Sequence, residues 1–130
     1  MAERKHENVD IVHSLEKFPW PLKDNSCHII IGHNIVQKIK PWLMIDFMNE
    51  VWRVIKPGGQ VAFSTPYAGS HGYYADPRNC NPINETTFFF FDPFYKSLYE
   101  HYQPKPWMID RGSPVWTVAG VLEIAMRPRK

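Results

Sequence analysis

Residues 47–66 decide the fold class, and they read Phe-Met-Asn-Glu-Val-Trp-Arg-Val-Ile-Lys-Pro-Gly-Gly-Gln-Val-Ala-Phe-Ser-Thr-Pro. Apolar residues at positions 43, 47, 51, 54 and 55 recur at helical spacing, so we expect one helix face to lie on a core. The helix is predicted to stop at Pro57, because proline cannot continue it, and the two glycines that follow permit the positive φ of a tight turn. Residues 60–64 then predict a buried strand. The stretch therefore predicts an α/β protein.

A further strand is expected upstream, over residues 27–31. This run is apolar apart from one histidine, which is typical of a strand covered on both faces. A predicted helix over residues 41–55, with Pro41 in its first turn, connects this strand to the strand at residues 60–64. Strand, helix and strand in this order predict parallel pairing through a right-handed crossover.

The C-terminal part of the chain predicts a helix and a hairpin. Residues 93–102 predict a helix capped by Asp92. Residues 107–110 and 115–126 predict two antiparallel strands at the sheet edge, with a bulge at Gly120. The expected order across the sheet is the strand of residues 27–31, the strand of residues 61–64, the C-terminal hairpin strand and then its partner.

Composition limits the class of protein. The 130 residues are 44% hydrophobic and carry a net charge of +2, which predicts a single domain over residues 1–130 and no polyanionic partner. The aromatic run at residues 88–91 has no interleaved basic stripe, so the pattern does not predict nucleic-acid binding. No apolar run is long enough to predict a membrane span, and the N-terminus lacks a hydrophobic signal core. With only Cys27 and Cys80, the chain is predicted to be cytoplasmic.

The amino-acid sequence of residues 47–66 resembles that of a known protein family. From Val9 onward, the chain resembles the C-terminal half of class I (type 11) S-adenosylmethionine-dependent methyltransferases, and the helix-Lys-Pro-Gly-Gly-strand motif is its most specific part. Residues 9–15 resemble the family's third strand and the loop after it, and residues 18–26 resemble the loop before the fourth strand. Parts of residues 65–93 resemble the acceptor-side insertion of one subgroup. The resemblance implies a truncated Rossmann-like methyltransferase sheet and S-adenosylmethionine as cofactor.

The chain departs from this family in its cofactor-binding parts. The first two strands and the glycine-rich turn are absent from the 130 residues. Ser14 and His28 replace two acidic residues, and Val36-Gln37 replaces a Glu-His pair. Without an anion-binding turn, the chain is not expected to bind S-adenosylmethionine tightly by itself. The sequence leaves open a methyltransferase-like protein of weak or no activity alone and a non-catalytic assembly or binding module derived from one.

Candidate cofactor-binding residues are Ser14, His33 and Asn34. His33 ends a predicted strand at its carboxyl end, where ligands lie in open α/β sheets. The alternative is a histidine hydrogen-bonded to the loop that follows it.

Candidate residues of a methyl-acceptor pocket follow the second strand and are His71, Tyr73, Tyr74, Asp76 and Asn79. An acceptor pocket needs aromatic walls and a few polar groups, and His71 or Asp76 is the candidate base. The alternative is a loop folded on itself, with Asp76 in an ordinary turn. No catalytic residue is assigned. No metal is predicted, because the spacing of these residues from Cys80 matches no zinc pattern.

The truncation also predicts an assembly. Without the first two strands, residues 27–31 become a sheet edge, and an apolar edge without charge is an aggregation hazard unless something covers it. We expect a homodimer about a two-fold axis, or a complex with a partner that supplies the missing half-sheet. In the dimer, flanking helices would bury Trp42, Met44 and Met48 at the interface.

Overall fold

The computed structural model describes residues 1–3, 8–117 and 119–130. The described helices and strands follow one another as β1 (Cys27–His33), η1 (Val36–Lys38), η2 (Pro41–Leu43), α1 (Met44–Val54), β2 (Ile55–Pro66), α2 (His71–Ala75), η3 (Thr87–Phe91), α3 (Lys96–Tyr99), β3 (Trp107–Ile109), β4 (Val115–Trp116) and β5 (Val121–Pro128), where η marks a short 3-10 helix.

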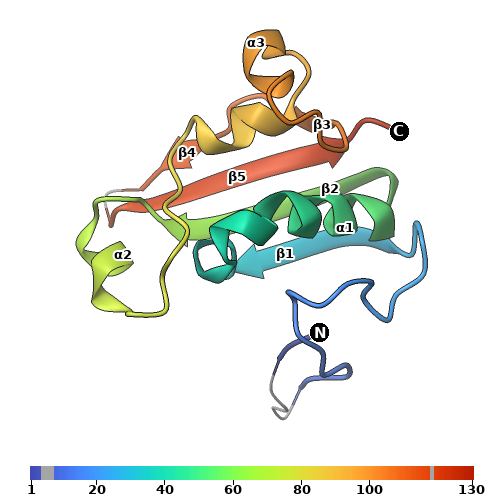
Figure 1. Ribbon diagram of the computed structural model, residues 1–130, viewed down its shortest axis with the longest axis horizontal. Coiled ribbons are helices and arrows are strands. Elements are labelled where there is room, and N and C mark those ends of the chain that lie inside the picture. Colours follow the sequence, from blue (N-terminus) through green and yellow to red (C-terminus); the bar gives the residue numbers. More distant parts are fainter. Residues whose placement is uncertain (4–7, 118) are drawn as a thin grey trace.

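The strands form one mixed sheet in the order β1-β2-β5-β3, with β4 also paired to β5 (Figure 1). β1 and β2 are parallel, and β5 is antiparallel to β2, β3 and β4. The predicted sheet order and the parallel pairing through a crossover are therefore confirmed. The fold is α/β, with parallel strands and a C-terminal antiparallel hairpin, as expected of a truncated methyltransferase sheet.

Helix α1 lies along one face of β1 and β2 (Figure 1). Its residues Phe47, Val51 and Val54 are buried, because their spacing turns all three toward the sheet. The Phe47 ring lies 5.7 Å from the ring of Trp20 and 6.0 Å from that of Phe63 on β2. The helix face predicted from the central motif is therefore the face that forms the core.

The end of α1 differs from the prediction. The helix stops at Val54, and the Lys-Pro-Gly-Gly segment already belongs to β2. The amides of Asn25 and Ser26 donate to the carbonyls of Arg53 and Val54 at 2.9 and 2.8 Å, so the preceding loop closes the helix. Gly59 is required for a different reason, since a Cβ there would lie 2.7 Å from a carbonyl oxygen of β1.

Two C-terminal predictions were also wrong in detail. Gly120 lies in the turn between β4 and β5, with φ +77°, and does not form a bulge; Val118 of the same run lies outside the described residues. The helix predicted over residues 93–102 is α3, which covers only Lys96–Tyr99, and Asp92 does not cap it. The Asp92 carboxylate is buried and instead accepts hydrogen bonds from the amide of Ile109 at 3.0 Å and from Arg129 at 2.9 Å.

The two faces of β1 are unequal. Ile29 is 61% exposed and Ile31 is 76% exposed, so the prediction of a strand covered on both faces was wrong. Met44 and Met48 are buried in the core beneath α1, so the prediction that they meet a partner was also wrong, whereas Trp42 is exposed. In a run without alternation of apolar and polar residues, the sequence does not indicate which side chains face the core. Which face of the strand is covered then depends on where the other elements pack.

Candidate functional site

The carboxyl ends of β1 and β2 meet at one edge of the sheet and position two of the predicted residues. His33 is the last residue of β1, and its Nδ1 lies 2.6 Å from the Oγ of Ser64 on β2. Asn34 follows with φ +54°, and its amide donates to the Ser64 carbonyl at 2.9 Å. The Asn34 Nδ2 lies 3.1 Å from His33 Nε2. Both residues are exposed at this edge, in an orientation fixed by β2.

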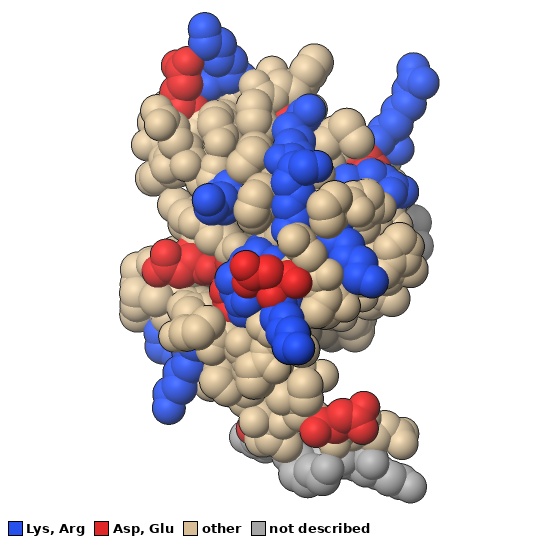
Figure 2. Space-filling model, turned by 90° about the vertical axis from the view of Figure 1, so that its right-hand side faces the viewer, with Lys and Arg blue, Asp and Glu red and all other residues tan. Residues whose placement is uncertain are grey.

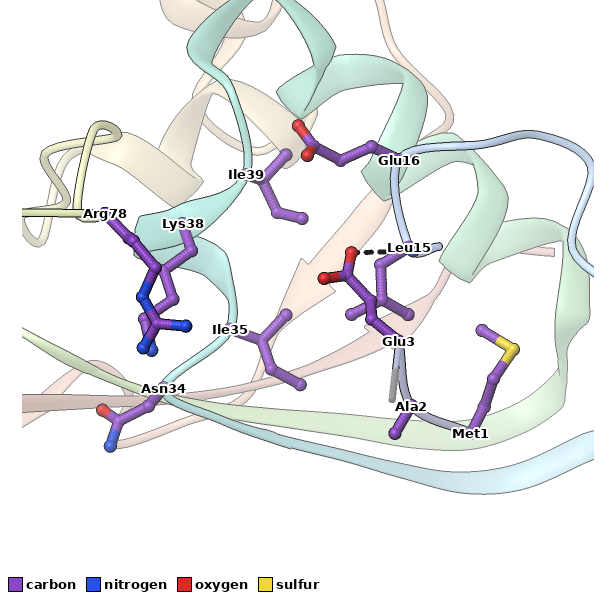
Figure 3. A pocket seen from close by; sticks show the side chains of 10 residues that line it. All are labelled: Met1, Ala2, Glu3, Leu15, Glu16, Asn34, Ile35, Lys38, Ile39 and Arg78. Carbon is purple, nitrogen blue, oxygen red and sulfur yellow. Dashed lines mark hydrogen bonds between the residues drawn. The ribbon is translucent and has the colours of Figure 1, made fainter. Parts of the chain in front are cut away.

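A cavity of about 460 Å³ opens beside this edge (Figure 3). Its walls come from the N-terminal residues, the loop that contains Leu15 and Glu16, the turn from Asn34 into η1, and Arg78 from the loop after α2. Asn34 lines the cavity, whereas Ser14 and His33 each directly precede a lining residue. The structure thus brings segments that are far apart in the sequence to one site.

One side of this cavity carries carboxylates that already have partners. Glu16 accepts hydrogen bonds from the Lys40 amide and the Lys40 ammonium, both at 3.0 Å. The hydrogen bond to Glu16 raises the pKa of Lys40. Glu3 accepts from the amide of Leu15 at 3.3 Å, drawn as a dashed line in Figure 3. Both carboxylates therefore serve the local structure.

The predicted acceptor residues lie on and after α2. Ser70 caps this helix by accepting from the Tyr73 amide at 3.2 Å. Tyr73 is buried, and its burial raises the pKa of its hydroxyl, whereas Tyr74 is exposed with its ring 5.3 Å from that of Tyr73. Asn79 donates to the Tyr73 carbonyl at 2.8 Å. These three residues form one packed unit, while His71 is exposed at the start of the helix.

Asp76 is held by cations. Its carboxylate accepts from Nη2 of Arg78 at 3.0 Å and from Nε of Arg78 at 3.3 Å, and it lies 3.6 Å from the ammonium of Lys38. Hydrogen bonds from the side chain and amide of Arg78 lower the pKa of Asp76 to about 2. A carboxylate with so low a pKa is a weak base near neutral pH.

A buried polar cluster that the sequence analysis did not predict joins the two sides of the site. Gln37 of η1 is buried and accepts from the hydroxyl of Thr65 on β2 at 3.1 Å. Its carbonyl also accepts from the amides of Cys80 and Asn81, both at 3.0 Å. The turn after β1 is therefore tied to the loop after α2. The sequence contained one weak signal, the uncharged polar Gln37 between the apolar residues Val36 and Ile39.

Several Lys and Arg side chains, with Asp and Glu side chains among them, gather at the opposite end of the sheet (Figure 2). The ammonium groups of Lys105 and Lys130 lie 5.2 and 4.3 Å from the centre of the Trp52 ring. Arg53 pairs with Asp24 at 2.7 Å at the same end.

Within the described ranges, no three His, Cys, Asp or Glu residues are grouped so that they could hold a metal ion. None of the described helices has the length and apolarity needed to cross a membrane.

Comparisons with known proteins place this fold among the methyltransferases. The PH0226 protein of Pyrococcus horikoshii OT3 matches over 94% of this chain, with a TM-score of 0.62 and 14% identity. A chain from the complex of the Haloferax volcanii Trm112 methyltransferase activator with a methyltransferase matches over 95%, with a TM-score of 0.64 and 9% identity. An S-adenosylmethionine-dependent methyltransferase from Methanosarcina mazei matches over 91%, with a TM-score of 0.58 and 15% identity.

The match found by sequence similarity covers a smaller part of the chain. A malonyl-[acyl-carrier protein] O-methyltransferase of Marinomonas sp. (strain MWYL1) is 42% identical over 52 residues, which are 38% of this chain and 18% of the relative. No protein-family model matches the chain. The chain spans 63 to 66% of the length of the three solved structures. The chain therefore has a methyltransferase fold, and it resembles the C-terminal half of such an enzyme.

Proposed function

We propose that the chain is the acceptor-side part of an S-adenosylmethionine-dependent methyltransferase, with weak or no activity alone. The observation that carries the proposal is the cavity at the carboxyl ends of β1 and β2, which combines Leu15 and Asn34 with Arg78. Ligands of open α/β sheets lie at this edge. The methyltransferase fold and the 52-residue likeness to an O-methyltransferase support the same class of reaction.

The residues at this edge fit part of such a cofactor. Ser14 and Asn34 offer a hydroxyl and an amide beside the cavity, whereas both ring nitrogens of His33 already have partners in Ser64 and Asn34. The 130 residues contain no glycine-rich anion-binding turn. When bound, S-adenosylmethionine would supply an electrophilic methyl group. Residues outside this sequence would then have to hold its amino-acid end and its ribose.

We expect these residues to come from a polypeptide that pairs with β1, either a second copy of the chain or a partner that carries the missing half-sheet. Two observations support this expectation: β1 lies at the end of the described sheet order, and the outer face of this edge strand carries the exposed apolar side chains of Ile29 and Ile31. One of the matched structures is itself a complex between a methyltransferase and an activator protein.

Calorimetric titration of the chain with S-adenosylmethionine tests the proposal. In the calorimeter, we expect no saturable binding in the micromolar range. In NMR spectra recorded at millimolar cofactor, we expect changes of amide chemical shift confined to Ser14, His33 and Asn34. The intact Methanosarcina mazei methyltransferase is the positive control. Asn34→Ser should weaken the response at millimolar cofactor, whereas Asn84→Ser, on an exposed loop, should leave it unchanged. Micromolar binding by the chain alone would refute an incomplete cofactor site.

A second candidate is a non-catalytic assembly or binding module derived from a methyltransferase. The pairing of Asp76 favours it, because Arg78 and Lys38 hold this carboxylate and its low pKa makes it a weak base. The two candidates differ in the assembled state. A methyltransferase binds the cofactor once the missing half is present, whereas a module binds none in any assembly.

A further inference from the structure

Two cations at one end of the cavity share a single carboxylate. Lys38, at the end of η1, and Arg78, in the loop after α2, both line the cavity. Figure 3 shows their side chains side by side, directed toward Asn34. Asp76 lies 3.6 Å from the Lys38 ammonium and 3.0 Å from Arg78 Nη2. This end of the cavity therefore carries a net positive charge.

Donors remain free in this group of side chains. Among the described residues, the Lys38 ammonium has no hydrogen-bond acceptor, and its one ion-pair partner is Asp76. Arg78 uses its Nε and Nη2 atoms for Asp76, and its Nη1 donates to no described residue. An ammonium offers three donors and a guanidinium five. The acids on the other side of the cavity, Glu3 and Glu16, have partners of their own.

We propose that the Lys38–Arg78 end of the cavity binds a carboxylate of the methyl acceptor. The inference rests on the proposed function and adds the chemical class of the acceptor. A carboxylate accepts hydrogen bonds through two oxygens, so it can bridge the ammonium and the unused side of the guanidinium. The bound carboxylate and Asp76 together then place two negative charges against two positive ones.

A carboxylate acceptor also needs no general base. Methylation of an ionised carboxylate forms an ester, since its oxygen attacks with a lone pair that it already holds. The new carbon–oxygen bond forms while the carbon–sulfur bond of the methyl donor breaks, and no proton leaves the acceptor. A site for this reaction needs cations that orient the acid and does not need the basic form of Asp76 or His71.

Titration with malonate, followed by amide chemical shifts, tests carboxylate binding in the absence of any cofactor. We expect saturable shifts at Lys38 and Arg78 with malonate and none with neutral dimethyl malonate. Lys38→Gln and Arg78→Gln should each weaken binding by about three- to fivefold, as expected for exposed ion pairs. Lys96→Gln, which removes a more exposed ion-pair partner, that of Glu100, should leave malonate binding unchanged.

Asp76→Asn gives the sharper test, because it removes the competing carboxylate from both cations. We expect malonate to bind this variant more tightly, and a gain of affinity does not arise from unfolding. Unchanged or weaker binding by Asp76→Asn, or equal binding of malonate and its dimethyl ester, would overturn the inference. Because these titrations contain no S-adenosylmethionine, their outcome is independent of the cofactor test of the proposed function.

Discussion

The edge of β1 offers the most direct test of assembly. The side chains of Ile29 and Ile31 point away from α1, and together they expose somewhat more than one whole isoleucine side chain. Replacing both with lysine keeps the strand and places two charges on its uncovered face. Charged edges are one means by which natural sheets avoid pairing with other chains. The double variant should therefore prevent any association through this surface.

The expected size of the effect follows from the exposed fractions of 61% and 76%. Full burial of one isoleucine side chain stabilises by about 1.5–3 kcal/mol, so covering both residues contributes about 2–4 kcal/mol per strand. A two-fold pair that buries this face of β1 in both copies would gain about 4–8 kcal/mol, whereas backbone pairing at the strand edge alone would leave the face uncovered. Loss of even the lower value weakens association by about three orders of magnitude.

Sedimentation equilibrium of the wild-type chain and of the Ile29→Lys, Ile31→Lys double variant measures this difference. We expect the wild-type chain to form dimers at micromolar concentration and the double variant to remain monomeric. Phe94→Lys is the control, because Phe94 is 78% exposed and lies outside β1. A wild-type monomer in the high micromolar range, with rapid amide exchange at Ile29 and Ile31, would refute the edge reasoning.

Two further substitutions test the core beneath α1 by urea denaturation. Glu50 is 7% exposed and accepts hydrogen bonds from Arg53 and from the Trp20 amide, so Glu50→Gln should cost about 2 kcal/mol. The hydrogen bonds from Arg53 lower the pKa of Glu50, so its contribution is complete above the unfolded pKa of about 4.3 and is lost as the pH falls through the lower folded pKa; a pH-independent difference between the two proteins would contradict this assignment. Gly32→Ala should cost about 1–3 kcal/mol, because its Cβ would lie 2.7 Å from the Phe63 ring, and an unchanged free energy of unfolding would show that the ring moves freely.

The strand order could be predicted because its signals are local. The apolar run of residues 27–31, the helix of the central motif and residues 60–64 follow one another closely, and a parallel pair needs a crossover of this kind. The helix end could not be placed from the same motif. The loop carrying Asn25 and Ser26 hydrogen-bonds the last turn, and no residue of the motif encodes that contact.

The candidate site was less predictable, because its parts meet only through tertiary contacts. Lys38 and Arg78 are forty residues apart in the sequence, in a 3-10 turn and in a loop, and neither position carries a periodic signal. Buried hydrogen bonds of Gln37 to Thr65 and to the loop after α2 bring them together. The sequence predicts Asp76 as a candidate base, but the fold places its carboxylate between two cations.

In this position the Asp76 carboxylate acts as a counter-ion of Lys38 and Arg78 and not as a base. Two cations at the rim of a cavity repel each other, and a shared carboxylate offsets that repulsion while the cavity holds no anion. With Arg78 lowering its pKa to about 2, Asp76 keeps its charge over the whole range in which proteins are usually stable. Lys38 nevertheless lies 3.6 Å away without a hydrogen bond to this carboxylate. Asp76 therefore balances the two cations without using all their donors, and it competes with a second carboxylate, which is why Asp76→Asn is expected to bind malonate more tightly.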